Sequence, residues 1–264
     1  MYSAQIRSSR TFRQKQIPSS SSSKNSLLFA VLVTLPLLLG GCGEKEAVPV
    51  KPNLKYEIKD GTVTITGCDK KASGALTIPA TIEGKPVTSI EDYAFRNCSS
   101  LTSITIPDSV TSIGMASFIG CTGLKSVTIG NSVTSIGTMP FSGCTSMTSI
   151  TIGDSVTWIG TNAFDHCSSL TSITIPDSVT SIGDGAFWGT GLTRITIPDS
   201  VTSIGDVPFY ECKSLTTVTF LGDAPNAGEG VFVGATPTIY RKPEAKGWGD
   251  TFGGRPVKLI SEKP

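Results

Sequence analysis

The chain has 264 residues and a nearly even charge balance, with 22 Lys and Arg against 21 Asp and Glu, so its formal net charge is +1. This balance excludes a nucleic-acid binder that relies on gross positive charge. The single histidine, His166, leaves no second imidazole for a catalytic set. The 28 glycines and the many Ser and Thr residues are typical of a repetitive or low-complexity chain.

The N-terminal segment has the layout of a secretion signal. Residues 1–26 contain basic but no acidic side chains, and the apolar run Leu27–Leu39 follows them. This run is short for a membrane-spanning helix and contains Pro36, so it suits the apolar core of a signal peptide better. It leads into two glycines and Cys42. The ending resembles the bacterial lipoprotein box, in which the cysteine is lipidated and becomes the first residue of the mature chain.

The resemblance to lipoproteins implies how the first part of the chain is divided. Residues 1–41 would be a cleaved signal peptide, Cys42 the lipidation site, and residues 42–53 a charged tether. Gly43 follows the cysteine where an aspartate would retain such a protein at the inner membrane. We therefore expect a lipid-anchored protein of the cell envelope, at the outer membrane or cell surface, with the membrane as a partner through the anchor. The alternative is an uncleaved membrane anchor followed by an ordinary cysteine.

The rest of the chain repeats itself about every 23 residues. Phenylalanine marks the period, with successive intervals of 23, 23, 23, 23, 22 and 23 residues: Phe95, Phe118, Phe141, Phe164, Phe187, Phe209 and Phe232. A cysteine stands three residues later in five repeats: Cys98, Cys121, Cys144, Cys167 and Cys212. The shortened repeat, which begins at Phe187, lacks this cysteine. A fixed period of this length predicts a stacked-repeat architecture.

Each repeat contains two short extended segments. In Ile104-Thr105-Ile106, which follows Leu101, the apolar side chains share one face and the hydroxyl lies between them. The segment Val110–Ile113 is also rich in β-branched residues. One turn is too short to bury its own apolar face, so neighbouring turns must stack around a common core. We predict a mainly β solenoid with turns of about 23 residues, short strands, and 3-10 or helical turns at the corners.

The recurring pattern Ile-Pro-x-x-Val-Thr-Ser-Ile-Gly-x-x-Ala-Phe-x-x-Cys-x-x-Leu resembles the BspA-like leucine-rich repeat of bacterial surface proteins. The resemblance runs from about Tyr56 to Ile260. It implies a leucine-rich-repeat solenoid over residues 54–264, with an N-terminal cap at 54–90 and a C-terminal cap at 221–264. Caps are expected because an uncovered terminal coil exposes strand edges.

The cysteine column has two interpretations. It could be a metal or redox site, or it could be a buried row of small thiols at one corner of each turn. Zinc sites use cysteines two to four residues apart that converge on one point, whereas a 23-residue spacing on a solenoid sets thiols in a line. We therefore predict a structural ladder of free, buried thiols, and neither a metal nor a cofactor. Cys68, in the cap, has no partner that its spacing would indicate.

Two other patterns suggest chemistry. His166 stands beside Cys167 as in a nucleophile pair, but Cys167 belongs to the ladder, so we interpret the pair as an accident of register. A recurring acidic corner could hold calcium, although Asp after Pro or Gly also suits turns: Asp108, Asp154, Asp177 and Asp199, with Asn131 in the same slot. We favour the turn. No nucleophile with a base and no acid–base pair emerges, so we do not expect an enzyme.

Residues that break the repeat are the candidates for a binding surface. Trp158 replaces a serine in one column and Arg194 replaces a serine in another, while Trp188 and Tyr210 each follow a recurring Phe. A tryptophan that we expect to be exposed in a serine column has no evident packing role. Aromatic residues and arginine are typical anchors of recognition surfaces. The plainer interpretation is neutral variation on a tolerant surface.

Three classes of function follow from this pattern. The leading hypothesis is a cell-surface lipoprotein that presents its repeat face for protein binding and adhesion, because the BspA-like resemblance implies a host protein, a matrix protein or a neighbouring cell as partner. The alternatives are a structural envelope protein with no dedicated ligand, and a glycan-binding solenoid that uses its Ser and Thr columns.

Overall fold

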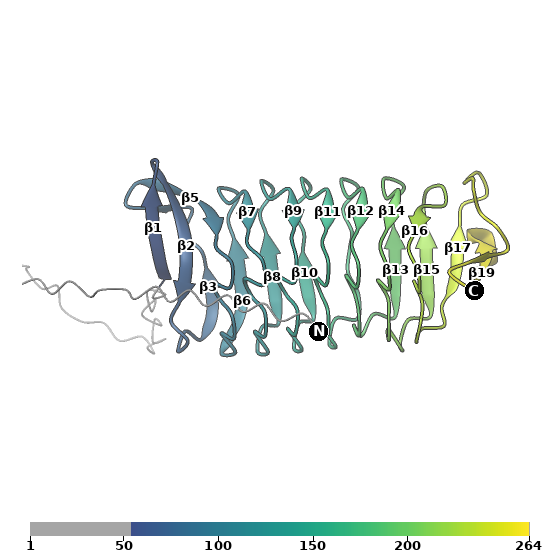
Figure 1. Cartoon of the computed structure of the whole chain (residues 1–264), viewed down its shortest axis with the longest axis horizontal. Coiled ribbons are helices and arrows are strands. Elements are labelled where there is room, and N and C mark those ends of the chain that lie inside the picture. Colours follow the sequence, from purple (N-terminus) through teal and green to yellow (C-terminus); the bar gives the residue numbers. More distant parts are fainter. Residues whose placement is uncertain (1–53, 264) are drawn as a thin grey trace, which may run out of the picture. The chain divides into compact units, whose positions relative to one another are not determined.

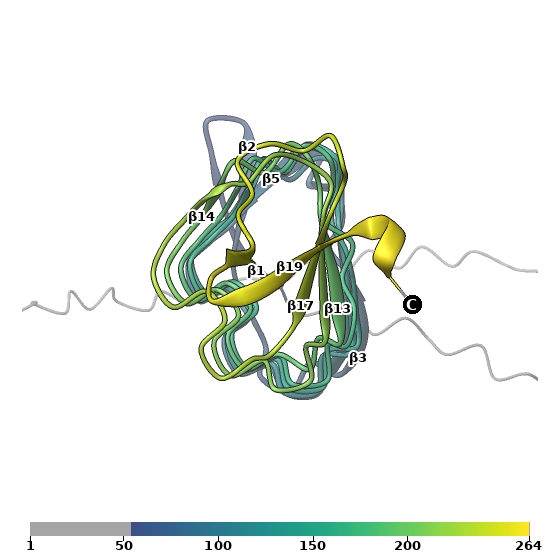
Figure 2. The ribbon, with the colours of Figure 1, turned by 90° about the vertical axis from the view of Figure 1, so that its right-hand side faces the viewer.

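A computed structural model describes residues 54–263 of the chain. The expected signal peptide (1–41), the lipidation site Cys42 and the tether (42–53) lie outside the described residues. The described residues form a β-solenoid whose coils stack along one axis (Figure 1) and superimpose around a shared interior when viewed end-on (Figure 2). The predicted mainly β, leucine-rich-repeat solenoid is therefore confirmed. Within residues 54–263, no helix is both long enough and apolar enough to span a membrane.

The N-terminal end begins with an antiparallel hairpin. Asp60 and Gly61 join its strands, and both have positive φ (50° and 77°), as a two-residue hairpin turn requires. The second strand of the hairpin then pairs in parallel with the strand Lys85–Ile90 of the first coil, so the hairpin covers the edge of that coil. The strands of this end are β1 (Leu54–Lys59), β2 (Thr62–Cys68), β3 (Gly74–Thr77), β4 (Thr81–Ile82) and β5 (Lys85–Ile90).

All but one of the regular coils contribute one longer and one shorter strand, and these form two parallel ladders on different sides of the solenoid (Figure 2). We call the ladder of longer strands the wide ladder and the ladder of shorter strands the narrow ladder. The wide ladder starts at β3 and continues through β6 (Leu101–Ile106), β8 (Ser126–Ile129) and β10 (Ser149–Thr151). It resumes with β13 (Arg194–Ile197), β15 (Thr217–Phe220), β17 (Thr238–Arg241) and β19 (Arg255–Leu259), which also pairs with β18 (Thr251–Phe252). Equivalent residues pair directly, as in Ile104 with Val127, so the repeat becomes a set of columns.

The narrow ladder carries two-residue strands. After β7 (Ser112–Ile113), which pairs with β5, it runs through β9 (Ser135–Ile136), β11 (Trp158–Ile159), β12 (Ser181–Ile182), β14 (Ser203–Ile204) and β16 (Asn226–Ala227). The wide ladder is interrupted between β10 and β13, because residues 171–176 form no strand. The narrow ladder is continuous at this point, from β11 to β12 and β14. Ile150 and Ile173 are only partly buried there.

The interior is built from columns of side chains at equivalent repeat positions, and one of these columns is entirely phenylalanine. The seven phenylalanines form one stack with ring centroids 4.8–5.8 Å apart and interplanar angles of 4–13°. Every one of them is at most 1% exposed, and the ladder cysteines and most of the strand isoleucines are buried beside them. This shared core supplies the burial that a single turn lacks.

The corners around each Phe are single turns and not helices. Cys98 N–H donates to the carbonyl three residues back, as in a 3-10 turn, whereas Phe95 N–H donates to Ser117 of the next coil. Positive φ recurs two residues before and two residues after each Phe, as at Tyr93 (60°) and Asn97 (56°). Because a left-handed residue interrupts each turn, no helix propagates. The only helix within residues 54–263 is the 3-10 helix η1 (Ile260–Glu262).

The C-terminal end is closed by aromatic side chains. The coil containing Phe232 is still regular, since its ring stacks on Phe209 at 5.5 Å. Beyond it, Phe252 packs edge-on against Phe220 and Phe232, with centroids 5.3 and 6.4 Å away. Trp248 lies 4.9 Å from Phe220. These rings cover the last coil, whereas a β-hairpin covers the first.

Candidate binding surfaces

The cysteine ladder is part of the core. All five of its thiols are fully buried. Four of them donate to the carbonyl of the Phe in the preceding coil: Cys121 to Phe95 (3.0 Å), Cys144 to Phe118 (3.3 Å), Cys167 to Phe141 (3.2 Å) and Cys212 to Phe187 (2.9 Å). Burial raises the pKa of Cys121 and Cys167 to about 12, so these thiols stay protonated and are poor nucleophiles. Across residues 54–263, no cluster of His, Cys, Asp and Glu side chains could hold a metal ion.

Thr190 occupies the ladder position of the shortened repeat. It is 3% exposed, and its hydroxyl lies 3.3 Å from the thiol of Cys212. Threonine and cysteine have similar volume, so the column continues through a repeat in which the sequence shows no cysteine. The missing residue of this repeat falls after Thr190, in the corner directly before β13.

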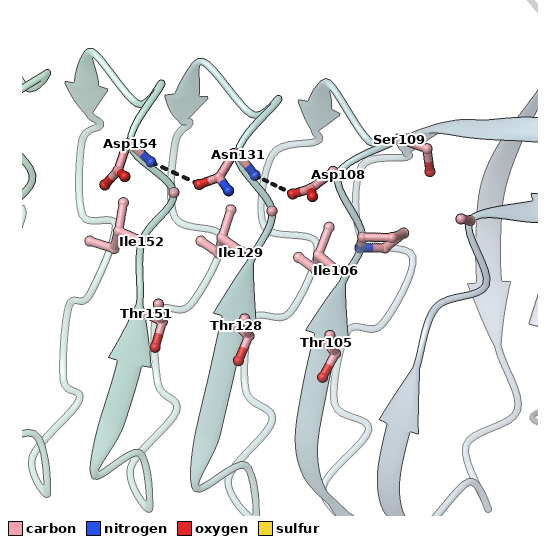
Figure 3. Close-up of a pocket in the computed structure, with 14 residues that line it drawn as sticks. Thr105, Ile106, Asp108, Ser109, Thr128, Ile129, Asn131, Thr151, Ile152 and Asp154 are labelled. Atoms are coloured by element: carbon pink, nitrogen blue, oxygen red, sulfur yellow. Dashed lines mark hydrogen bonds between the residues drawn. The ribbon is translucent and has the colours of Figure 1, made fainter.

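Three residues of the acidic corner, Asp108, Asn131 and Asp154, are linked from coil to coil. Asn131 N–H donates to Asp108 Oδ1 at 2.6 Å, and Asp154 N–H donates to Asn131 Oδ1 at 3.2 Å (Figure 3). We expected side-chain bonds within a local turn, but these bonds cross from one coil to the next. The side-chain oxygens satisfy backbone N–H groups at the end of the wide strands, which is a structural role.

A shallow groove of about 590 Å³ follows this row along β6, β8 and β10. Figure 3 shows Thr105, Thr128 and Thr151 in one row, with isoleucines between them and the acidic row. The three threonines are exposed, whereas the isoleucines are buried. The groove therefore offers hydroxyl, amide and carboxylate groups, and its lining includes no aromatic or basic side chain. It lacks the residue types that anchor protein interfaces.

A different corner carries a cluster of aromatic side chains. Trp188 and Tyr210 each follow a core Phe, and their ring centroids are 4.7 Å apart with a 60° tilt. The ring of His166 lies 6.2 Å from Trp188 on the other side. On the following coil, Val233 is 48% exposed. We call these four residues the aromatic corner.

The fold positions the aromatic corner through the backbone. Six of the seven residues that follow a core Phe are exposed or half-buried, because the Phe itself points inward, and only Ser142 is buried. The residue after that has positive φ, as at His166 (55°). Hydrogen bonds hold the coils in register at this point: His166 N–H donates to Trp188 O at 2.7 Å, and Gly189 N–H donates to Tyr210 O at 2.8 Å. The rings therefore stand on consecutive coils of a rigid ladder.

Acidic groups lie beside these rings. Asp165 contacts His166 Nδ1, and its other oxygen lies 3.2 Å from Ser142 Oγ. Glu211 forms an ion pair with Lys213 at 2.8 Å, and this bond raises the pKa of the exposed lysine. The side chains of Asp165 and Glu211 are 21% and 36% exposed, so both carboxylates remain within reach of a partner.

The structure brings together two of the four candidate residues. Trp188 and Tyr210 are in contact, whereas Trp158 stands on β11 of the narrow ladder and Arg194 on β13 of the wide ladder. Trp158 was expected to be exposed but is half-buried between Ser135 and Ser181, its neighbours in register.

Sequence reasoning missed His166 as a member of the surface cluster. We considered His166 only as the neighbour of Cys167 and interpreted that pair as an accident of register; the Cys167 thiol donates to the Phe141 carbonyl inside the core. The signal was present in the repeat, because His166 stands two residues after Phe164 and therefore on the same corner as Trp188.

The solenoid of 23-residue coils, with its Phe stack and cysteine ladder, defines a leucine-rich-repeat protein. Residues 88–216 match the BspA type leucine rich repeat region in six copies. The described fold is similar to the crystal structure of the T. pallidum leucine rich repeat protein, with 32% identity over 69% of this chain and 86% of that one and a TM-score of 0.63. The chain belongs to the BspA-type leucine-rich-repeat family.

A second similar structure is that of a leucine rich cell surface protein from Faecalibacterium prausnitzii. Its identity is 30%, over 70% of this chain and 68% of that one, with a TM-score of 0.48. No curated protein matches the chain.

Proposed function

We propose that this protein is a lipid-anchored bacterial surface protein whose solenoid binds a protein partner through the aromatic corner. The observation that carries the proposal is the contact between Trp188 and Tyr210 on an outward-facing corner, continued by His166 and Val233 on the coils to either side. Trp and Tyr are the residues most enriched at binding hot spots. Solenoids also use extended surfaces of this kind for partners.

The neighbouring charges indicate what such a partner would present. Aromatic ring faces attract cations. The Asp165 carboxylate contacts His166, and Glu211 directly follows Tyr210 in the chain. A segment with basic and apolar side chains fits this surface. We expect a host or matrix protein, or a protein on a neighbouring cell, in line with the family resemblance.

Binding to intact cells and to matrix proteins tests the proposal. The purified protein, labelled with a fluorophore, is titrated onto epithelial cells, bacterial cells and immobilised matrix proteins. We expect saturable binding that weakens by roughly thirtyfold or more in the double variant Trp188→Ala/Tyr210→Ala, since two hot-spot side chains are lost. Trp158→Ala and Arg194→Ser are matched controls on other faces of the solenoid and should bind as the parent does.

Each other outcome selects an alternative. Saturable binding that the double variant retains would remove the aromatic corner from the site. Binding that disappears when the target is treated with periodate, but not with protease, would indicate a glycan-binding solenoid. An absence of saturable binding on every target would favour a structural envelope protein.

The lipid anchor needs a separate test. Metabolic labelling with an alkyne fatty acid should mark the parent protein, and Cys42→Ser should abolish the label and release the protein from the membrane fraction. Protease added to intact cells should then degrade the anchored protein, while a periplasmic marker stays intact. Survival of the protein under these conditions would contradict surface display.

A further inference from the structure

The N-terminal cap contains a thiol pair that the repeat does not explain. Cys68 is the last residue of β2, and Cys98 is the first member of the ladder. The two side chains are hydrogen-bonded to each other and are 5% and 0% exposed. Two thiols that are 30 positions apart in the sequence therefore face each other inside the fold.

Cys98 differs from the rest of the ladder in what its thiol faces. The four later thiols each donate to the carbonyl of a core Phe in the preceding coil. Phe95 is the first ring of the Phe stack, and the residue one period before it is Ala72. The segment that precedes the first coil therefore has no core Phe whose carbonyl could accept from Cys98. There the sulfur meets Cys68 and the end of the Lys70 side chain.

Lys70 approaches the pair from the cap. Its ammonium lies 3.9 Å from Cys98 Sγ and donates a hydrogen bond to the carbonyl of Arg96. The hydrogen bond from Cys68 and the Lys70 charge lower the pKa of Cys98 to about 7, against burial and the nearby Asp69, which raise it. The same hydrogen bond, together with burial, raises the pKa of Cys68.

We propose that Cys68 and Cys98 form a disulfide that ties the N-terminal cap to the first coil. The oxidant would be a disulfide-donating compound or protein, as found in compartments outside the cytoplasm. The Cys98 thiolate attacks one sulfur of the oxidant disulfide, and one oxidant thiolate leaves. Cys68 then loses its proton to that thiolate and attacks the Cys98 sulfur, which releases the second oxidant thiolate. The two cysteines lose two electrons, and the oxidant is reduced to one thiol and one thiolate, which takes up from water the proton that Cys98 released when it ionised.

The position of this bond suggests what it protects. The hairpin β1–β2 covers the exposed edge of the first coil, and Cys68 ends that hairpin. A solenoid unfolds from its ends because each coil contacts only its neighbours. A disulfide between hairpin and ladder closes a loop of 30 positions and restricts the unfolded chain at this end.

Oxidation of the full chain with oxidised glutathione at pH 7.5 tests the proposal. The chain carries Cys42→Ser so that only the six described cysteines can react. After alkylation in denaturant, peptide mass mapping should find one linked pair, Cys68 with Cys98, and four alkylated thiols. Cys121→Ser should retain the linked pair, while Cys68→Ser should lose it. A wild-type pair that stays reduced, or linkages scattered over the ladder, would overturn the proposal.

Two further measurements keep the test independent of folding defects in the cysteine variants. Lys70→Gln should slow formation of the disulfide by roughly threefold or more at pH 7, and much less at pH 9, since a thiol of ordinary pKa is ionised there without help. An unchanged rate at pH 7 would contradict the role of Lys70. The oxidised parent should melt roughly 5–10 °C above the reduced parent, and equal melting temperatures would contradict a stabilising tie.

Discussion

Two neighbouring columns of the solenoid follow opposite rules. The core Phe column contains the same residue in all seven repeats and stacks at 4.8–5.8 Å. The column one residue later contains seven different residues: Arg96, Ile119, Ser142, Asp165, Trp188, Tyr210 and Val233. The inner side chain must fill a space bounded by rings above and below, whereas the outer one borders solvent. The difference teaches that packing, and not nearness in the chain, decides which residues a column tolerates. The outer column is where this protein can acquire a partner-specific surface.

The largest expected effect contrasts the two columns directly. Phe187→Ala removes a ring that stacks on Phe164 and Phe209 at 5.6 and 5.5 Å, and it should lower the free energy of unfolding by about 3–5 kcal/mol. Trp188→Ala, one residue later, should cost about 1–2 kcal/mol because this ring is only half-buried. Urea unfolding followed by circular dichroism measures both. Equal losses would break the comparison.

A second contrast lies within one glycine column. A Cβ at Gly160 would stand 2.3 Å from the carbonyl oxygen of Gly137, whereas a Cβ at Gly137 would meet nothing closer than 3.6 Å. Gly160→Ala should therefore lower the free energy of unfolding by about 2–3 kcal/mol, and Gly137→Ala should change it by about 0.5 kcal/mol or less. Thermal melts of the two variants check this, and similar melting temperatures would show that the coils can separate at this corner.

The buried thiols predict a loss of stability in alkali. The pKa of Cys121 and Cys167 is raised to about 12 in the fold, so between about pH 9 and pH 12 the unfolded chain releases protons that the folded chain retains. Stability is therefore complete below pH 9 and falls by about 1.4 kcal/mol per pH unit for each thiol above it. Cys121→Ala should show a slope shallower by that amount in urea unfolding at pH 9–11. Parallel slopes for parent and variant would sink the prediction.

The smallest expected effect is an increase in stability, from the substitution Ser117→Ala. Ser117 is fully buried in the column before the core Phe, and its hydroxyl has no hydrogen-bond partner within residues 54–263. Alanine occupies this position in three other repeats: Ala94, Ala163 and Ala186. Ser117→Ala should raise the free energy of unfolding by about 1 kcal/mol, because an unsatisfied hydroxyl leaves the core. A destabilised variant would show that Ser117 makes a contact that this geometry does not reveal.

Most of the core was predictable from the period. The recurrence of Phe, Cys and Ile at one interval placed these side chains in shared columns, and their burial agrees with that expectation. Two interior features escaped prediction. Thr190 continues the cysteine ladder through a repeat that has no cysteine. The glycines after the narrow strands, with the exception of Gly137, are needed for close coil-to-coil approach and not only for a turn.

The surface was less predictable. From the sequence, four residues were equally good candidates for a binding surface, since each breaks the repeat: Trp158, Trp188, Arg194 and Tyr210. Only Trp188 and Tyr210 meet, because they occupy the same position on successive coils, whereas the other two stand on different ladders. His166 stands one position later on its own coil, two residues after Phe164, and still reaches Trp188 across the same corner.

The sequence by itself determined the coil length, the two strand segments of each coil and the side chains that fill the interior, because a short turn with one apolar face can bury that face only by stacking on copies of itself. Only the tertiary structure decided which outer residues share a surface, where the wide ladder breaks, and that Cys68 faces Cys98. Those contacts join residues about one coil apart in sequence. The backbone dihedral angles at the corners decide which residues of neighbouring coils lie opposite each other, and the residue pattern does not specify these angles.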